Sequence, residues 1–545
     1  MRVLGIGYFV AHDANVALVS DGKVEFACSE ERLTRRKRDG SFPQRAIDHV
    51  RSFYPTAEHI VASYNDDAKY KEAHLGITDS VRITRFAGLQ RQHEVALRSA
   101  GTTAFLGHHF CHAAGGLFTS GFRDAIVITY DGGIVCEPWL ATLWEARDNT
   151  LKPIRSLTRL DGATAAIRYS AVTSLLGFRP VHDEGKITGL AACGSVNDYC
   201  IGELVAAFEK QPEPSTYYNG KFSQDFATIR ERYSTADIAA SIQAMTEETV
   251  LELLAQHVSN PTATNLVMAG GLFANVLLNF RIKKMGFKKI YVYPAMGDEG
   301  LSAGAALAHA VKLGHSPSKL DHLYLGPEYS ASDISNALTS YGLQHTRYEK
   351  VESEIALLLA EGKVVGRFNG PMEFGPRALG NRSILYRADD PSVNSWLNAK
   401  LGRTETMPFA PVTLSSFAED MYSELDGLER CTPFMTTVVP CKDKMRRQSP
   451  AVVHVDGTAR PQLVSSDTNA SLHAVLSEYF ALTGTPTLIN TSFNLHGEPI
   501  VCSPEDAIRC FLNGGLDYLA IGECLVKNPS ISRRERLDVK ARQLL

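Results

Sequence analysis

Short apolar runs separated by polar turns organise the start of the chain. Residues 2–6 form an apolar run that predicts a buried strand, and residues 15–20 and 23–28 predict two more. Asp21 and Gly22 stand between the last two runs, and an Asp-Gly pair there predicts a hairpin because both turn positions favour a positive φ. We therefore expect a strand, a polar turn at His12-Asp13, and a hairpin.

A second copy of this order follows about 120 residues later. Residues 124–130 predict a strand, residues 131–133 a polar glycine turn, and residues 140–146 and 151–156 another hairpin. Two copies of strand, acidic turn and hairpin favour an internal duplication. The duplicated α/β unit that binds a nucleotide between its lobes is the actin-like, or sugar-kinase-like, fold. The alternative, which the pattern leaves open, is an ordinary α/β protein with two similar hairpins.

The remaining apolar pattern predicts helices and a second domain. Helices are expected over residues 87–99, 111–118, 238–258 and 300–312, and strands over residues 265–268 and 290–293. Residues 325–350 are rich in turn-forming types, and a new α/β pattern begins after them with a helix over 352–361 and a strand over 364–368. We expect two domains, over residues 1–345 and 346–545.

Composition narrows the class of protein. The 545 residues include 56 Lys and Arg against 60 Asp and Glu, a net charge of −4, so nothing indicates the clustered basic surface of a nucleic-acid-binding protein. No apolar run reaches the roughly 18 residues of a membrane-spanning helix. The ten cysteines form no C-x-x-C pair, which favours reduced thiols. With no recognisable signal peptide, we expect a cytoplasmic protein that contacts neither nucleic acid nor membrane.

Two histidines four residues apart suggest a metal site. His108 and His112 are four residues apart, so on a helix they would share one face about 6 Å apart, which suits two nitrogen ligands on one ion. Asp131 and Asp298 each follow a predicted strand, where a side chain faces a crevice. Such a mixed set favours Fe(II), with Mn(II) or Mg(II) as alternatives, over structural zinc. A pair of structural histidines is the competing interpretation.

Glycine-rich turns indicate a nucleotide site. Gly270, Gly271 and Asn275 follow a predicted strand and are expected to open a helix, and Gly297 begins a similar turn. Glycine lets the backbone approach a phosphate, and a helix N-terminus favours an anion. Lys186 adds a cation for a phosphate.

A Gly- and Pro-rich loop over residues 374–383 carries Arg377, Asn381 and Arg382. Guanidinium forks suit an anion with several oxygens, and further donors follow later in the chain: Lys400, Arg403, Arg460, Asn490, Ser492 and Asn494. A surface loop with ion-paired arginines is the alternative.

At the first predicted turn, His12 with Asp13 is a candidate general base for a hydroxyl group, although a structural role is equally open.

Several of these motifs together resemble those of the NodU/CmcH-type O-carbamoyltransferases, over nearly the whole chain. The most specific is the run 374–383, and the others are His12-Asp13, residues 30–32, His108 with His109 and His112, Asp131, residues 184–186, Gly270-Gly271, residues 297–300 and residues 491–494.

The resemblance implies a Kae1-like (ASKHA) N-terminal domain and a YrdC-like α/β C-terminal domain. In such enzymes carbamoyl phosphate is hydrolysed to carbamate in the second domain, and ATP converts the carbamate to a carbamoyl-adenylate. The first domain passes the carbamoyl group to a hydroxyl group of a small natural product, such as an antibiotic, a toxin or a glycan-like acceptor. A homodimer is compatible with the resemblance.

The resemblance also implies roles for residues. His108, His112, Asp131 and Asp298 would hold the metal, with His12 and Asp13 catalytic. The nucleotide would contact Lys186, Gly270, Gly271, Asn275 and Gly297. Carbamoyl phosphate would contact Arg377, Asn381, Arg382, Arg403, Arg460, Asn490, Ser492 and Asn494.

One stretch departs from the family pattern. Leu401 and Met407 stand where many members have basic residues, and Lys400 is a candidate to compensate.

A carbamoyltransferase that modifies tRNA or protein, and an actin-like sugar kinase, are the alternative functions. The sequence does not identify the acceptor.

Overall fold

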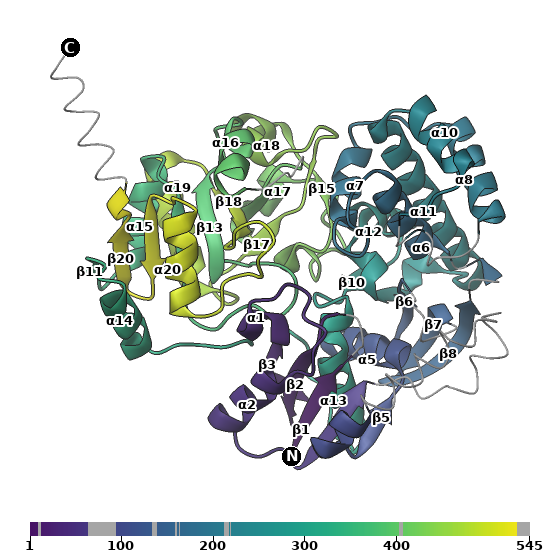
Figure 1. Cartoon of the computed structure of the whole chain (residues 1–545), viewed down its shortest axis with the longest axis horizontal. Coiled ribbons are helices and arrows are strands. Elements are labelled where there is room, and N and C mark those ends of the chain that lie inside the picture. Colours follow the sequence, from purple (N-terminus) through teal and green to yellow (C-terminus); the bar gives the residue numbers. More distant parts are fainter. Residues whose placement is uncertain are drawn as a thin grey trace.

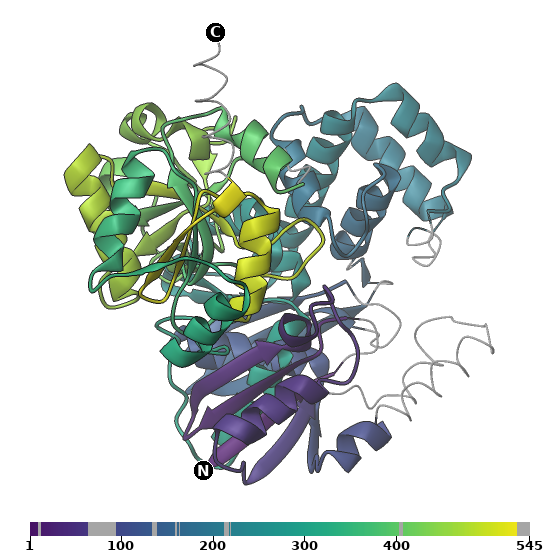
Figure 2. The ribbon, with the colours of Figure 1, turned by 60° about the vertical axis from the view of Figure 1, so that its left-hand side comes forward.

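A computed structural model of the chain describes residues 1–8, 12–63, 94–132, 139–158, 161–162, 164–211, 217, 220–402 and 407–530. Figure 1 shows a sheet with flanking helices at the bottom, a group of helices at the upper right, and a further α/β part at the upper left. In the rotated view of Figure 2 the last two parts lie side by side above the first sheet.

The first sheet forms from the start of the chain, as the apolar runs predict. Its five strands are β1 (Arg2–Gly7), β2 (Asn15–Ser20), β3 (Lys23–Ser29), β4 (His59–Ser63) and β5 (Ala104–Leu106), in the order β3-β2-β1-β4-β5. β2 is antiparallel to β1 and β3, whereas β4 is parallel to β1 and β5. Asp21 and Gly22 both have positive φ, 49° and 82°, which confirms the predicted hairpin turn.

The second sheet repeats this arrangement. Its strands are β6 (Ala125–Tyr130), β7 (Trp139–Arg147), β8 (Thr150–Thr158), β9 (Asn265–Ala269) and β10 (Lys289–Val292), in the order β10-β9-β6-β7-β8. β7 is antiparallel to β6 and β8, whereas β9 is parallel to β6 and β10. Both sheets therefore have the strand order 3-2-1-4-5 with the same directions, and the predicted internal duplication is confirmed.

Two helices pack tightly between the sheets. They are α5 (His108–Ser120) and α13 (Leu301–Lys312), and α5 starts three residues earlier than the sequence predicts. A Cβ atom on Gly304 of α13 would lie 2.0 Å from the carbonyl oxygen of Cys111 on α5, so the two backbones touch at this point. This contact fixes the first turns of α5, which carry His108 and His112.

A helical layer separates β8 from β9 in the sequence. It consists of α6 (Ala165–Leu175), α7 (Glu184–Ala191), α8 (Asp198–Lys210), α10 (Gln224–Arg232) and α11 (Thr235–His257), and α12 (Val276–Lys283) follows β9. α11 confirms the long predicted helix, and the side chain of Ser234 accepts a hydrogen bond from the backbone of Asp237 to begin it. Of the predicted helix over 87–99, residues 94–99 are helical and the rest lie outside the described residues.

The C-terminal unit (residues 331–527) is a second α/β structure. Its eight-stranded sheet has the order β11-β20-β19-β12-β13-β18-β14-β17, with these bounds: β11 Thr346–Arg347, β12 Val365–Phe368, β13 Arg382–Arg387, β14 Ala410–Leu414, β17 Gln462–Val464, β18 Thr487–Ser492, β19 Tyr518–Ile521 and β20 Cys524–Lys527. Its helices are α14 (Ala331–Ser340), α15 (Val351–Ala360), α16 (Val393–Lys400), α17 (Ala418–Met421), α18 (Asp443–Gln448), α19 (Ala470–Thr483) and α20 (Pro504–Asn513), and a separate two-stranded ladder pairs β15 (Val439–Pro440) with β16 (Thr458–Ala459).

Buried apolar side chains join these parts. One continuous cluster contains Ile128 of β6, Ile242 of α11, Leu278 of α12, Ile384 of β13 and Leu519 of β19. The second sheet, the helical layer and the C-terminal unit therefore share one core.

The fold class predicted from the sequence, a mixed α/β chain with a duplicated actin-like N-terminal part, is confirmed. The division at residue 345 and the YrdC-like character of the C-terminal unit stay predictions. Among the described residues, none of the helices combines the length and the apolar character that crossing a bilayer requires.

The close approach of α5 and α13 generates a stability prediction. Gly304→Ala places a methyl group against a backbone oxygen, and such overpacking costs about 1–3 kcal/mol. We expect the thermal unfolding midpoint, measured by scanning calorimetry, to fall by a few degrees. Gly202→Ala in α8 is the control, because its Cβ would meet open space and alanine favours a helix. A midpoint that rises in both variants would contradict the close contact.

Candidate active site

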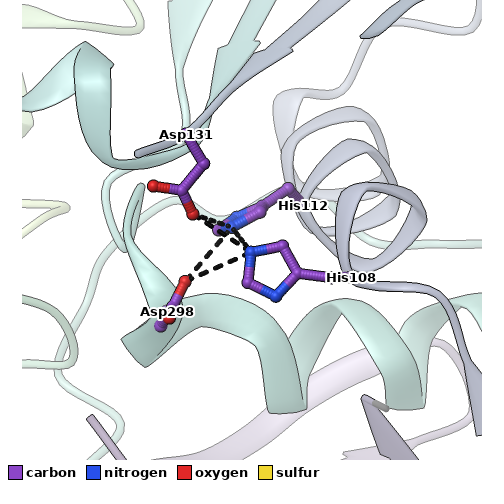
Figure 3. Close-up of side chains that lie close together, drawn as sticks. All are labelled: His108, His112, Asp131 and Asp298. Carbon is purple, nitrogen blue, oxygen red and sulfur yellow. Dashed lines mark hydrogen bonds and ion pairs between the residues drawn. The ribbon is translucent and has the colours of Figure 1, made fainter. Parts of the chain in front are cut away.

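Four side chains from three segments converge between the two sheets. His108 and His112 come from the first turns of α5, Asp131 follows β6, and Asp298 begins the short turn before α13. Figure 3 shows the two imidazoles facing the two carboxylates. One ligand atom from each of the four residues lies within 4.8 Å of the others.

The contacts within this cluster are direct. Nε2 of His108 lies 3.0 Å from Oδ2 of Asp131 and 3.4 Å from Oδ1 of Asp298. Nε2 of His112 lies 3.3 Å and 3.5 Å from the same two oxygens. The backbone N–H of Gly132 donates to Oδ1 of Asp131 at 2.7 Å, which turns its other oxygen toward the histidines. All four predicted metal ligands therefore lie together.

Burial and pairing shift the acidity of the cluster. Burial raises the pKa of Asp131, but the hydrogen bonds from His108 and His112 outweigh burial and hold this pKa well below its ordinary value. Burial lowers the pKa of His112, but its bonds to Asp131 and Asp298 outweigh that effect and raise it. By their chemical type, two imidazole nitrogens and two carboxylates form a donor set that suits a divalent ion such as Fe(II), Mn(II) or Mg(II).

His109 has a different role from its neighbours. One of its ring nitrogens lies 2.9 Å from the Thr129 hydroxyl and the other 3.0 Å from the Trp139 carbonyl oxygen. Burial lowers the pKa of His109 to about 3, so the ring is neutral. It braces α5 against the second sheet.

His12 lies beside the cluster. Its Nδ1 is 2.9 Å from Oδ2 of Asp13 and 3.7 Å from Oδ2 of Asp298, whose other oxygen faces His108 and His112. Burial lowers the pKa of His12, but the hydrogen bond to Asp13 and the charge of Asp298 outweigh burial and raise it. Asp298 thus connects the candidate base to the candidate metal site.

The predicted nucleotide residues lie in two places. Gly270, with φ of 104°, has no room for a side chain, since a Cβ would lie 2.3 Å from the carbonyl oxygen of Tyr130, and Gly271 approaches Asp131. Gly297 directly precedes Asp298. These glycines border the cluster, whereas Lys186 lies on α7 with its Nζ 3.3 Å from Asp183.

The turn after β9 differs from the predicted direct start of a helix. Residues Gly271–Ala274 form a 3-10 turn, and Asn275 then begins α12 by accepting a hydrogen bond from the backbone of Leu278 at 3.1 Å. The Asn275 amide also pairs with Gln243, which donates in turn to Glu247. Sequence reasoning missed Gln243 and Glu247, although their spacing of four on α11 places them on one helix face.

The arginine loop (residues 374–383) is held by a buried carboxylate that sequence reasoning also missed. Oε1 of Glu373, a residue 4% exposed, accepts backbone hydrogen bonds from Leu379, Asn381 and Arg382 at 2.7, 2.8 and 3.1 Å. The sequence feature that could have identified Glu373 is its position directly before the loop. Arg367, 2% exposed, braces the same loop by donating to the Gly380 carbonyl oxygen and to the Asn381 amide oxygen.

Arg382 is directed inward. It is fully buried, and its terminal nitrogens donate to the carbonyl oxygens of Asn369, Asn381 and Pro327 at 2.9, 2.9 and 3.3 Å. Its guanidinium also lies 3.7 Å from the ring centre of Phe368. These contacts fix the loop, and anion binding by Arg382 stays a prediction.

The other predicted anion-binding residues lie around the same unit. Arg377 and Arg460 are partly exposed. Arg460 lines a cavity of about 30 Å³ with Thr188, Met407, Phe409 and His454, between α7 and the C-terminal unit. Asn490 donates to Gln462 at 2.7 Å, Asn494 donates to two backbone carbonyl oxygens, and Ser492 pairs across the sheet with Ser383. Arg403 lies outside the described residues.

The departure from the family pattern has a clear structural setting. Leu401 is buried, and Met407 fills space above α7, since a Cβ on Gly189 would lie 1.9 Å from its Cγ. Lys400 lies against Gly515. That Lys400 compensates for the two replaced basic residues stays a prediction.

The arginine loop adjoins the cluster. A Cβ on Gly375 would lie 3.1 Å from the carbonyl oxygen of Pro294, in the segment that leads from β10 to Asp298. The Gly375 carbonyl oxygen also accepts a hydrogen bond from Arg32 at 3.1 Å. The arginine loop therefore contacts, at Gly375, the segment that leads to Asp298.

Comparison with known proteins gives a family for both halves. The model described as "Carbamoyltransferase N-terminus" matches residues 2–72 and 89–307, and the model described as "Carbamoyltransferase C-terminus" matches residues 356–528. An uncharacterized protein of Synechocystis sp. is 32% identical over 98% of this chain and 98% of its own length. Nodulation protein NolNO of Sinorhizobium fredii is 31% identical over 96% of this chain and 80% of its own length.

Likeness to solved structures is weaker. The activator of 2-hydroxyisocaproyl-CoA dehydratase from Clostridium difficile is 13% identical, covering 57% of this chain and 95% of its own, with a TM-score of 0.34. A likeness at this score carries no conclusion about function.

The cluster generates a metal-binding prediction. His108→Ala removes a nitrogen ligand, and we expect the dissociation constant for Mn(II), followed by the electron paramagnetic resonance of the free ion, to rise at least about ten-fold. His345→Ala is the control and should keep the wild-type affinity, because His345 is exposed and is not part of the cluster. Equal affinity in wild type and His108→Ala would contradict the metal site.

Proposed function

The chain belongs to the carbamoyltransferase family, and we propose that it moves the carbamoyl group of carbamoyl phosphate, through a carbamoyl-adenylate, to a hydroxyl group of a small natural product. The family models over both halves support the transfer of a carbamoyl group. The ATP-dependent route and the class of acceptor are what the motif resemblance implies.

In this proposal the C-terminal unit makes the activated intermediate. Water attacks the phosphorus of carbamoyl phosphate and the bond from phosphorus to the bridging oxygen breaks, so phosphate leaves and both oxygens on the carbamoyl carbon remain in the carbamate. Arg377 and Arg460 hold the anions. A carbamate oxygen then attacks the α-phosphorus of ATP, and the bond to pyrophosphate breaks. Guanidinium groups suit this step because they donate two parallel hydrogen bonds to phosphate oxygens.

The transfer step belongs to the cluster. The acceptor oxygen attacks the carbamoyl carbon, the bond from this carbon to the phosphate oxygen breaks, and AMP leaves. His12 takes the proton of the acceptor hydroxyl, and Asp13 orients its ring. A divalent ion held by His108, His112, Asp131 and Asp298 would act as a Lewis acid toward an oxygen of the adenylate.

One observation carries the proposal. Asp298 turns one carboxylate oxygen toward the two histidines and the other to 3.7 Å from Nδ1 of His12. A proton acceptor beside a candidate metal site is what attack by a hydroxyl on a metal-polarised group requires. The arginine loop that meets this region at Gly375 supports a short path for the labile intermediate.

The products formed from ATP test whether the reaction passes through a carbamoyl-adenylate. Purified protein with carbamoyl phosphate, ATP and Mg(II) is expected to release pyrophosphate, measured by a coupled enzymatic assay. Release of ADP in place of pyrophosphate and AMP would indicate a kinase-like reaction and contradict the adenylate.

Two variants separate the half-reactions. His12→Asn keeps the ring-sized polar side chain but loses the base, so we expect transfer of ¹⁴C-carbamoyl to the acceptor to fall about 10²–10⁴-fold while adenylate formation persists. Arg377→Ala should slow adenylate formation and raise the KM for carbamoyl phosphate. Arg347→Ala, an exposed arginine paired with Glu523, is the control. A His12→Asn variant that transfers at the wild-type rate would exclude His12 as the base.

A further inference from the structure

A short segment rich in charge runs between the two candidate sites. The bridging segment (residues 30–38) contains α1 (Glu30–Thr34), which Figure 1 places at the edge of the first sheet that faces the C-terminal unit. Glu30, Glu31 and Arg32 are only 2%, 9% and 8% exposed. Charged side chains are rarely buried to this extent unless they are paired.

Two arginines of the bridging segment form hydrogen bonds and an ion pair with the C-terminal unit. Arg32 donates to the carbonyl oxygen of Gly375 in the arginine loop at 3.1 Å. Arg35 donates to the carbonyl oxygens of Pro499 and Ile500, both at 2.7 Å, and its Nε lies 3.2 Å from Asp506. Two guanidinium groups of the N-terminal half thus hold backbone of the C-terminal half.

The other end of the bridging segment holds the turn that carries the candidate base. The backbone N–H of Glu30 donates to the carbonyl oxygen of Ala14 at 2.8 Å, and the N–H of Ala14 donates to Asp39 at 3.0 Å. A guanidinium nitrogen of Arg38 lies 4.0 Å from Oδ2 of Asp13, the oxygen that pairs with His12.

Glu31 connects the two ends. Its Oε1 lies 3.1 Å from Arg32, and its Oε2 accepts a hydrogen bond from the backbone N–H of Arg38 at 2.6 Å. A continuous chain of contacts therefore runs, in order, through Gly375, Arg32, Glu31, Arg38, Asp13 and His12. Glu31 and Arg32 are buried, so removing the charge of either leaves the other uncompensated, which loosens the contact far more than at an exposed ion pair.

We propose that Glu31 and Arg32 are positioning residues that seal the junction between the two sites and so retain the carbamoyl-adenylate. The inference rests on the proposed function. When the junction is loose, water adds to the carbamoyl carbon, the bond from this carbon to the phosphate oxygen breaks, and AMP leaves with carbamate and a proton as the other products. A sealed junction suppresses this loss when no acceptor is present.

The experiment uses full-length protein with carbamoyl phosphate, ATP and Mg(II) and without acceptor, and follows pyrophosphate by rapid quench. We expect wild-type protein to release a burst of about one pyrophosphate per chain, followed by a slow steady phase. Glu31→Gln removes the charge that joins Arg32 to Arg38, and Arg32→Lys removes the guanidinium fork between Glu31 and Gly375. Both variants should keep the burst and raise the steady phase several-fold.

A faster steady phase distinguishes a role in sealing the junction from a role in stabilising the fold. A damaged fold would reduce both the burst and the steady phase. Arg36→Ala is the matched control within the same segment, since its side chain is 70% exposed and contacts Asp39 and Ser41. It should behave as wild type.

Three results would overturn the inference. They are an unchanged steady phase in Glu31→Gln and Arg32→Lys, a loss of burst and steady phase together, and an equal gain in Arg36→Ala. If the thermal midpoint shows that either variant does not fold, Arg35→Lys takes its place. Arg35 contacts Pro499 and Ile500 and so holds the same junction. Wild-type protein that releases no pyrophosphate would overturn the proposed function itself.

Discussion

Two carboxylates, of Asp131 and Asp298, that face two buried imidazoles are the constraint on which the rest of the site depends. His108 and His112 approach the carboxylates of Asp131 and Asp298 to between 3.0 and 3.5 Å, and their hydrogen bonds hold the pKa of Asp131 well below its ordinary value. Each of these side chains is fixed by a rigid element, and the backbone contact between α5 and α13 at Gly304 sets the distance between the two helices. Since Asp298 also lies beside His12, any shift in this packing moves the candidate base relative to the candidate metal site.

The duplication explains why such different segments meet. In both sheets the first strand lies at the centre of the order 3-2-1-4-5. His12-Asp13 follows β1 and Asp131 follows β6, which makes them counterparts in the two copies. The C-terminal unit completes the arrangement by placing its arginine loop against the segment that leads from β10 to Asp298.

Features set by neighbouring residues could be predicted from the sequence. The Asp21-Gly22 hairpin follows from local φ preferences. The grouping of His108, His112, Asp131 and Asp298 follows from the spacing of four between the histidines and from the position of each acid after a strand. Contacts between distant residues could not be predicted. The backbone hydrogen bonds to Glu373 form only when the loop folds around its carboxylate. The three carbonyl oxygens that accept hydrogen bonds from Arg382 include that of Pro327, which lies 55 residues earlier in the chain. The early start of α5 was missed because histidine has only a modest helix propensity and Gly107 offers no capping side chain.

The central claim is that carbamate is activated by the α-phosphate of ATP and then discharged to an acceptor by cleavage of its carbon–oxygen bond. This route leaves one oxygen of the carbamoyl group on AMP. The most direct measurement supplies carbamoyl phosphate with ¹⁸O in both oxygens bound to the carbamoyl carbon and determines the mass of the AMP formed. The account predicts AMP that carries one ¹⁸O atom, whereas AMP without the label, or ADP as the nucleotide product, would contradict it.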